Sequence, residues 1–232
     1  MARGFTVQYL PLLLGLLAYS GVASAQVAPT TDDVASYSGL HAAAHVGDAE
    51  MIARLAASGA NLDARDKVGR TPAHVAAFAS NDDTLRALAT AGADLNALEG
   101  QAYDVLTIAA VANDLDIVEL ALELGNRADL ITSPYDGTAL IAAAHLGHHE
   151  VVRLLAAGGA PLDHINNLGW TALMEAVVLG DGGPDHVATV EALLAAGADP
   201  MIADRDGKTP LYHAKAKGFE RIAALLMEAG RN

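Results

Sequence analysis

Hydrophobic residues in this chain fall into two kinds of short segment that recur in pairs. In the first kind, small apolar residues follow a single polar residue, and most of them are alanine, as at positions 42–44, 76–77, 109–110 and 142–144. In the second kind the apolar residues are larger and spaced to form one stripe of a helix, as in Val151, Val152, Leu154 and Leu155. Because alanine favours helix and lets helices approach closely, the pattern predicts pairs of short helices.

The helix pairs recur with a period of about 33 residues, which is set by polar residues that can cap the first helix. Such side chains accept a hydrogen bond from the free amides of a helix start. Pro72 and Pro210 follow two of the caps, at the first helical position. The six cap positions are Ser38, Thr71, Asp104, Thr138, Thr171 and Thr209.

Glycine residues end the second helix of most pairs, since glycine adopts the left-handed conformation that terminates helices. They are Gly59, Gly92, Gly125, Gly159 and Gly197. Asp, Asn and Gly residues beyond them predict short hairpins. A single helix pair cannot bury its apolar face alone, so stability must come from stacking on neighbours. We therefore predict an all-α solenoid of about six helix-turn-helix units with short β-hairpin loops, at 36–65, 66–98, 99–132, 133–165, 166–203 and 204–232.

One unit carries a family resemblance. The segment 71–76, Thr-Pro-Ala-His-Val-Ala, resembles the ankyrin signature Thr-Pro-Leu-His-x-Ala at all but one position, and segments 38–43 and 209–211 are partial copies. The chain therefore resembles ankyrin-repeat proteins over residues 36–230. The resemblance implies that His41 and His74 each hydrogen-bond a neighbouring hairpin. Segments 180–186 and 195–200 also resemble small exported ankyrin proteins of Gram-negative bacteria.

The first 25 residues do not fit the repeat. Arg3 is a lone positive charge, residues 10–18 are apolar, and Ala23-Ser24-Ala25 is a small-x-small cleavage site before Gln26, which together predict a secretory signal peptide. The apolar run is short for a membrane core of about 30 Å, which argues against an uncleaved anchor. We expect a periplasmic protein, or alternatively a secreted one, with no membrane insertion after cleavage. Residues 26–35 are expected to be a flexible lead-in.

Charge and composition exclude some classes of binding partner. The formal net charge is −14, and an acidic surface repels nucleic acid and anionic lipid, so we expect neither as a partner. The chain has no cysteine, which excludes disulfides and thiolate metal sites.

Two columns of residues are not required for stacking, and both are free to vary. The first precedes the cap and the second lies seven residues after it. Ankyrin-like geometry implies that both face the concave side, and aromatic and arginine side chains dominate interface hot spots. From the two columns we predict a protein-binding set of Tyr37, His45, Arg70, Phe78, Tyr103, His145, Trp170 and Lys208. The alternative is that an aromatic ring beside a hairpin only covers its neighbour.

Two repeats depart from the pattern. The fifth has about five extra residues at 181–186, where Gly and Pro predict an exposed loop that is either a binding element or a tolerated insertion. The third has Asp104 in place of the usual threonine and an extra residue after Gly125, which predicts a looser hairpin.

The best candidate for metal binding is the group His145, His148, His149 and Glu150. It lacks the His-Glu-x-x-His arrangement on one helix, so we predict no metal site and no cofactor. No nucleophile elbow, phosphate-binding loop or dinucleotide fingerprint is present, and we predict that the protein is not an enzyme.

The sequence thus predicts an exported, monomeric ankyrin-repeat module that binds a periplasmic or surface protein on its concave face. The resemblance implies one refinement, an accessory role for a periplasmic haem enzyme such as catalase. Two alternatives stay open. One is a secreted effector that binds host proteins, and the other is a metal or haem carrier that uses His145, His148 and His149.

Overall fold

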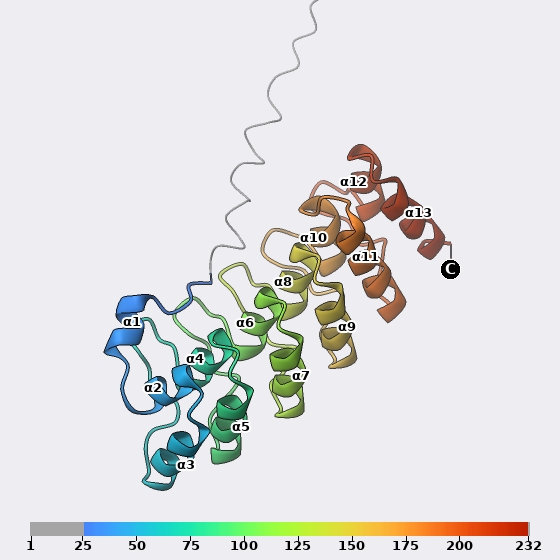
Figure 1. Cartoon of the computed structure of the whole chain (residues 1–232). Coiled ribbons are helices and arrows are strands. Elements are labelled where there is room, and N and C mark those ends of the chain that lie inside the picture. Colours follow the sequence, from blue (N-terminus) through green and yellow to red (C-terminus); the bar gives the residue numbers. More distant parts are fainter. Residues whose placement is uncertain (1–25, 232) are drawn as a thin grey trace, which may run out of the picture.

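The computed structural model describes residues 26–231, and the predicted leader lies outside them. Figure 1 shows a row of helix pairs placed side by side in chain order. The first helices of the described pairs are α2 (Gly39–Val46), α4 (Pro72–Phe78), α6 (Val105–Ala112), α8 (Ala139–Leu146), α10 (Ala172–Val178) and α12 (Pro210–Ala216). The second helices are α3 (Ala49–Ala57), α5 (Asp82–Ala91), α7 (Leu115–Glu123), α9 (His149–Ala157), α11 (Pro184–Ala196) and α13 (Glu220–Ala229).

Each helix packs on its counterpart in the next repeat. First helices contact first helices from α2 to α12, and second helices contact second helices from α3 to α13 (Figure 1). The predicted all-α repeat stack is therefore confirmed. We call the side formed by the first helices and the loops the inner face. No helix among residues 26–231 combines the length and the apolar character that crossing a bilayer requires.

The first helices start where the caps predict. All six predicted polar residues occupy the N-cap position. The side chains of Asp104, Thr138, Thr171 and Thr209 each accept a hydrogen bond from the backbone N–H three residues later. These bonds satisfy an amide that the helix itself leaves free.

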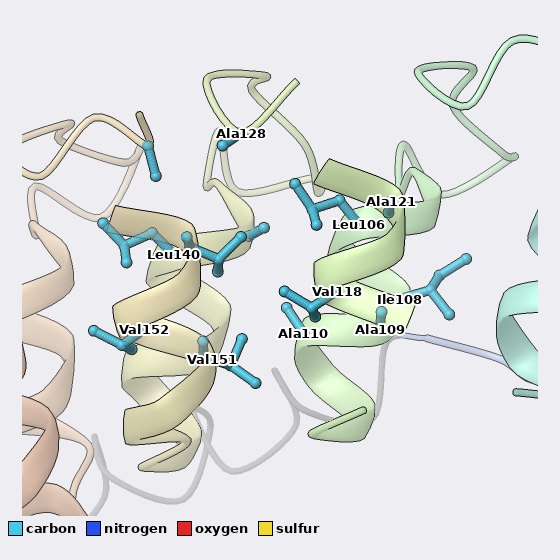
Figure 2. Close-up of a cluster of buried hydrophobic side chains, with 14 of the residues drawn as sticks. Leu106, Ile108, Ala109, Ala110, Val118, Ala121, Ala128, Leu140, Val151 and Val152 are labelled. Carbon is cyan, nitrogen blue, oxygen red and sulfur yellow. The ribbon is translucent and has the colours of Figure 1, made fainter. Parts of the chain in front are cut away.

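The core runs through the stack between the two rows of helices. Ala109 and Ala110 on α6 are fully buried, as are the larger Val118 on α7 and Val151 and Val152 on α9 (Figure 2). The alanines let successive first helices approach, and the larger residues fill the space behind them. Burying such a side chain stabilises the fold by roughly 1.5–3 kcal/mol.

One side chain and one backbone hydrogen bond close each of these loops, without a strand ladder. In each loop an oxygen of that side chain accepts hydrogen bonds from the backbone N–H groups two and four residues later, as in Asp66, Glu99, Ser133, Asn166 and Asp204. Within residues 26–231 the only bridge of β type joins Thr132 to Gly137. The loops therefore have hairpin shape without strands.

The expected flexible lead-in is instead partly helical. Helix α1 (Thr31–Ser36) begins with a capping box, in which Thr30 Oγ1 accepts from Asp33 N and Asp33 Oδ2 accepts from Thr30 N. Asp33 is buried. Local sequence does not predict α1, because the residues that bond its Asp33, namely Lys67 and Arg70, lie in the second repeat.

The extra residues of the fifth repeat also differ from the expected loop. Helix α11 begins at Pro184, so half of segment 181–186 forms its first turn. Proline has no N–H to lose at the first helical position, where its fixed φ suits the helix. The exposed loop is therefore shorter than predicted.

Candidate functional site

The structure divides the predicted binding residues into two groups. Six are partly exposed, namely Tyr37, His45, Phe78, His145, Trp170 and Lys208. The other two, Arg70 and Tyr103, are buried, and the expectation that their side chains are free to meet a partner is wrong.

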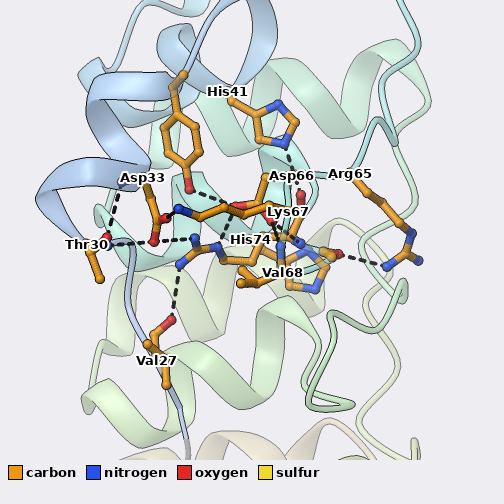
Figure 3. A network of polar contacts seen from close by, with 12 residues as sticks. Val27, Thr30, Asp33, His41, Arg65, Asp66, Lys67, Val68 and His74 are labelled. Atoms are coloured by element: carbon orange, nitrogen blue, oxygen red, sulfur yellow. Dashed lines mark hydrogen bonds and ion pairs between the residues drawn. The ribbon is translucent and has the colours of Figure 1, made fainter.

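Arg70 is buried because it joins the N-terminal segment to the second repeat. Figure 3 shows the surrounding polar network, with Asp33, Asp66 and Lys67 close together. Its Nε donates to Asp66 Oδ2 at 2.7 Å, its Nη2 to Asp33 Oδ2 at 2.8 Å and its Nη1 to the carbonyl of Val27 at 3.2 Å. Lys67 Nζ adds an ion pair to Asp33 Oδ1 at 2.6 Å. The guanidinium supplies donors in a planar fork that can serve all three acceptors.

These contacts keep the carboxyl groups of Asp33 and Asp66 ionised. The hydrogen bonds from Lys67 and then Arg70 hold the pKa of Asp33 far below its ordinary value. Burial works against ionisation of Asp66, but its hydrogen bond from Arg70 leaves the pKa of that carboxyl lowered. The cluster therefore consists of charged groups that compensate one another. Burial, together with the hydrogen bond that Tyr37 donates to Asp66, raises the pKa of the Tyr37 phenol.

Tyr103 is buried and lines a pocket on the inner face, and burial raises its pKa to about 12. The pocket is narrow, with a cavity volume of about 50 Å³. Helices α6, α8 and α10 and the loops before them supply its walls. Tyr103 and Gly137 come from the first predicted column and Val111 and His145 from the second, so the structure brings the two columns together here.

Glu175 is the charged residue of this pocket, and it is only 3% exposed. Asn166 Nδ2 donates to its Oε1 at 2.8 Å, and His145 Nδ1 lies 3.2 Å from its Oε2. A buried carboxylate needs such partners, because its transfer out of water is costly. His145 is thus held in place by Glu175 and is only partly available to a ligand.

The other histidines have structural contacts. His41 Nε2 and His74 Nε2 each lie 3.0 Å from the carbonyl oxygen that precedes the next cap, those of Arg70 and Tyr103, which confirms the role implied by the resemblance. His148 Nδ1 lies 3.0 Å from the Ala110 carbonyl oxygen. The residues that the structure describes contain no cluster of three His, Cys, Asp or Glu side chains arranged to hold a metal ion.

Segment 181–186 caps a first helix. His186 Nε2 lies 3.0 Å from the carbonyl oxygen of His145 near the end of α8, and its Nδ1 lies 2.9 Å from Asp181 Oδ1. Asn81 makes the corresponding contact to α2, where its Nδ2 donates to the carbonyls of Ala44 and His45. The insertion therefore has a structural role at the carbonyl end of α8.

Sequence reasoning missed several residues of the pocket, including Glu175, Asn166 and Gln26. A signal existed for one of them. At the position of Glu175, the other repeats carry Ala42, Val75, Ile108, Ala142 and His213. A carboxylate at a position that is apolar in most repeats is a polar departure of the kind that functional sites produce.

The regular stack of helix pairs, with a pocket on its inner face, places this protein in the class of helical-repeat scaffolds. The profile of the family Ankyrin repeats (3 copies) matches residues 10–99 and 106–204. The chain belongs to the ankyrin-repeat family. Ankyrin repeats are in general a non-catalytic scaffold for protein–protein interaction.

Similar proteins are bacterial as well as eukaryotic. The chain is 35% identical over 189 residues to the ankyrin repeat protein YahD of Escherichia coli (strain K12), a match that covers 81% of this chain and 94% of YahD. The crystal structure of an ankyrin repeat domain from Acinetobacter baumannii AYE is similar, with a TM-score of 0.78 and 42% identity, over 82% of this chain and 97% of that one.

A second similar structure contains a protein complex. It is that of the predatory endopeptidase Bd0816 from Bdellovibrio bacteriovorus with the immunity protein Bd3460. The matched chain has a TM-score of 0.68 and 26% identity, and the match covers 83% of this chain and 98% of that one.

Proposed function

We propose that this protein is an exported ankyrin-repeat module that binds a periplasmic or surface protein on its inner face. The observation that carries the proposal is the pocket between α6, α8 and α10, where both predicted columns meet. Its walls are mostly apolar and aromatic, with a few polar groups that converge on it, which is the usual composition of a binding site.

The stacked architecture suits such a role. Inner-face side chains of the internal repeats stand on helices or loops that neighbouring repeats fix on both sides, so little conformational entropy is lost when a partner arrives. The complex of Bd0816 with Bd3460 supports the idea that a chain of this shape takes part in a complex with an enzyme. By analogy, an enzyme is the class of partner to look for first.

Affinity capture from a periplasmic extract tests the proposal. The double substitution Trp170→Ala with Phe78→Ala removes two partly exposed rings from the inner-face columns. We expect it to abolish capture of the partner while the circular dichroism spectrum stays unchanged. The matched control is Arg86→Ala with Arg221→Ala on the second helices, where both side chains are more than half exposed. The control is expected to retain the partner.

Equal capture by both double variants would show that the partner does not use the inner face. A haem enzyme among the captured proteins would support the accessory role described above. Recovery of the protein only outside the cell would contradict periplasmic residence and favour the secreted effector.

Export itself has a separate test. The proposed cleavage site predicts a mature protein that begins at Gln26 and is released by osmotic shock. Mass spectrometry of the N-terminal peptide, together with cell fractionation, measures both. An intact leader on a protein that stays with the cytoplasm contradicts export and leaves the inner-face proposal to the capture experiment.

A further inference from the structure

The pocket on the inner face contains a carboxylate that stacking does not require. Glu175 accepts one hydrogen bond on each oxygen, from Asn166 and from His145. A carboxylate oxygen has two lone pairs, so each oxygen can accept a second donor. Among the described residues, His145 is the only ion-pair partner of Glu175, and it carries a full charge only when its ring is protonated.

Comparison between repeats shows whether the loop or the packing of the helices requires a negative charge at the position of Glu175. In the sixth repeat the equivalent His213 bonds Asp204, which stands at the position of Asn166. In the sixth repeat a residue without negative charge at this helix position therefore bonds the loop side chain. In repeats one to four the same position is Ala, Val or Ile, so packing does not need the charge either.

The walls of the pocket indicate what the free lone pairs can accept. Val111, Ile141 and Leu168 give an apolar lining, and Tyr103 and Tyr135 contribute aromatic rings. An extended apolar stem with a cationic end matches both features, as in lysine and arginine. A charge-assisted hydrogen bond to a buried carboxylate is stronger than one made in water.

We propose that the pocket binds a lysine or arginine side chain of the partner protein, with Glu175 as its counter-charge. This inference rests on the proposed function, since it names the chemistry of the partner on the same face. The chain's own N-terminal segment shows how the mouth can be entered. Gln26, which lines the pocket, donates from its side-chain Nε2 to the carbonyl oxygen of Thr107 at 3.1 Å. A partner segment enters at the same place and displaces Gln26.

Titration of the purified protein with capped amino acids, followed by NMR, tests the inference without the partner. The probes are the N-acetyl methylamides of lysine, arginine and norleucine, the last of which has the apolar stem without the charge. We expect saturable shifts at residues around Glu175, with a dissociation constant at least fivefold lower for one of the cationic probes than for norleucine. The better of the two cationic probes identifies the ammonium or the guanidinium as the preferred group.

Glu175→Gln keeps the shape of the side chain and removes its charge, and it is expected to weaken binding of that probe at least fivefold. The control Glu150→Gln removes an exposed carboxylate on α9 and is expected to leave binding unchanged. If Glu175→Gln does not fold, Ala142→Leu narrows the pocket while the carboxylate stays, and it should weaken binding equally.

Equal affinity for norleucine, or undiminished binding by Glu175→Gln or Ala142→Leu, overturns the inference. So does the absence of any saturable binding. None of these outcomes affects the capture experiment, which depends on Trp170 and Phe78, so the two ideas fail independently.

Discussion

At the scale of single residues, His74 shows how a signature residue makes stability depend on pH. It is fully buried, accepts a hydrogen bond on Nδ1 from Thr71 N at 3.1 Å and lies with Nε2 3.0 Å from the Tyr103 carbonyl oxygen. Burial disfavours the charged ring and lowers its pKa to about 4. A proton on Nδ1 would also face the Thr71 N–H, so the neutral ring is the one that fits.

This residue predicts a loss of stability in mild acid. The unfolded histidine, with a pKa near 6.5, binds its proton first, so stability is fully present above about pH 6.5 and falls as the pH approaches 4. The shift corresponds to about 2 kcal/mol of unfolding free energy lost between pH 7 and pH 5. Urea denaturation at several pH values measures it. His74→Gln should flatten this part of the profile, and an unchanged slope in that variant would contradict the assignment.

A pair of equivalent threonines on the second helices gives a second prediction. Thr189 on α11 is buried and its hydroxyl has no hydrogen-bond partner, whereas Thr84 at the same position of α5 donates to the Asn81 carbonyl at 3.0 Å. Replacing an unsatisfied buried hydroxyl by a methyl group removes a desolvation cost. We expect Thr189→Val to raise the unfolding free energy by about 1 kcal/mol and Thr84→Val to lower it. Chemical denaturation of the two variants measures both unfolding free energies, and destabilisation by Thr189→Val would refute the prediction.

At the scale of elements, the turn before α11 depends on a close approach. Gly182 has φ of +74°, and a Cβ there would lie 2.4 Å from Cδ1 of Phe219. Gly59 has φ of +82° with no atom near the corresponding position. Both alanine variants carry the cost of left-handed backbone, about 1 kcal/mol. Gly182→Ala must also displace Phe219, so we expect it to lower the melting temperature more than Gly59→Ala. Equal melting temperatures would show that Phe219 moves freely.

The elements that could be predicted from the sequence are those fixed by local interactions. A cap such as Thr138 bonds an amide three residues away, and the glycine after each second helix acts within one turn. Helix α1 was missed because Asp33 finds its partners, Arg70 and Lys67, 34 or more residues later. The sequence predicts a break at Pro184, whereas the structure has this proline at the first helical position, where it starts α11. Local sequence does not distinguish those two roles of proline.

In the candidate site, too, local features could be predicted from the sequence and features that depend on distant residues could not. Periodicity identified the columns that contain Val111 and His145, and these do line the pocket. It could not show that Arg70 and Tyr103 are buried, because their burial depends on the N-terminal segment and on neighbouring loops. Glu175 was missed because it lies between alanines and other packing positions on its helix.

At the scale of the whole molecule, the N-terminal segment is a cap for the first half of the stack. Segment 26–36 is linked to three successive repeats, because α1 leads directly into α2 of the first, Val27 and Asp33 accept hydrogen bonds from Arg70 in the second, and Gln26 donates to Thr107 in the third. Figure 3 shows Asp33 facing Lys67 of the second repeat. In a stack where each repeat contacts only its neighbours, a segment that lies across several repeats adds contacts that the terminal repeat otherwise lacks.

Deletion of residues 26–36 should therefore loosen one end of the stack and leave the other unchanged. We expect faster amide hydrogen exchange in α2 to α5 and unaltered exchange in α11 to α13, because exchange reports local opening and the hydrogen bonds lost with residues 26–36 do not reach α11 to α13. Arg70→Met should give the same pattern, since it leaves Asp33 and Asp66 without their guanidinium. Lys67→Gln, which removes the charge of a side chain that is mostly exposed, should change little. Uniform acceleration across all repeats would show that the molecule opens as one unit, and unchanged exchange in α2 to α5 would show that the segment contributes no stability.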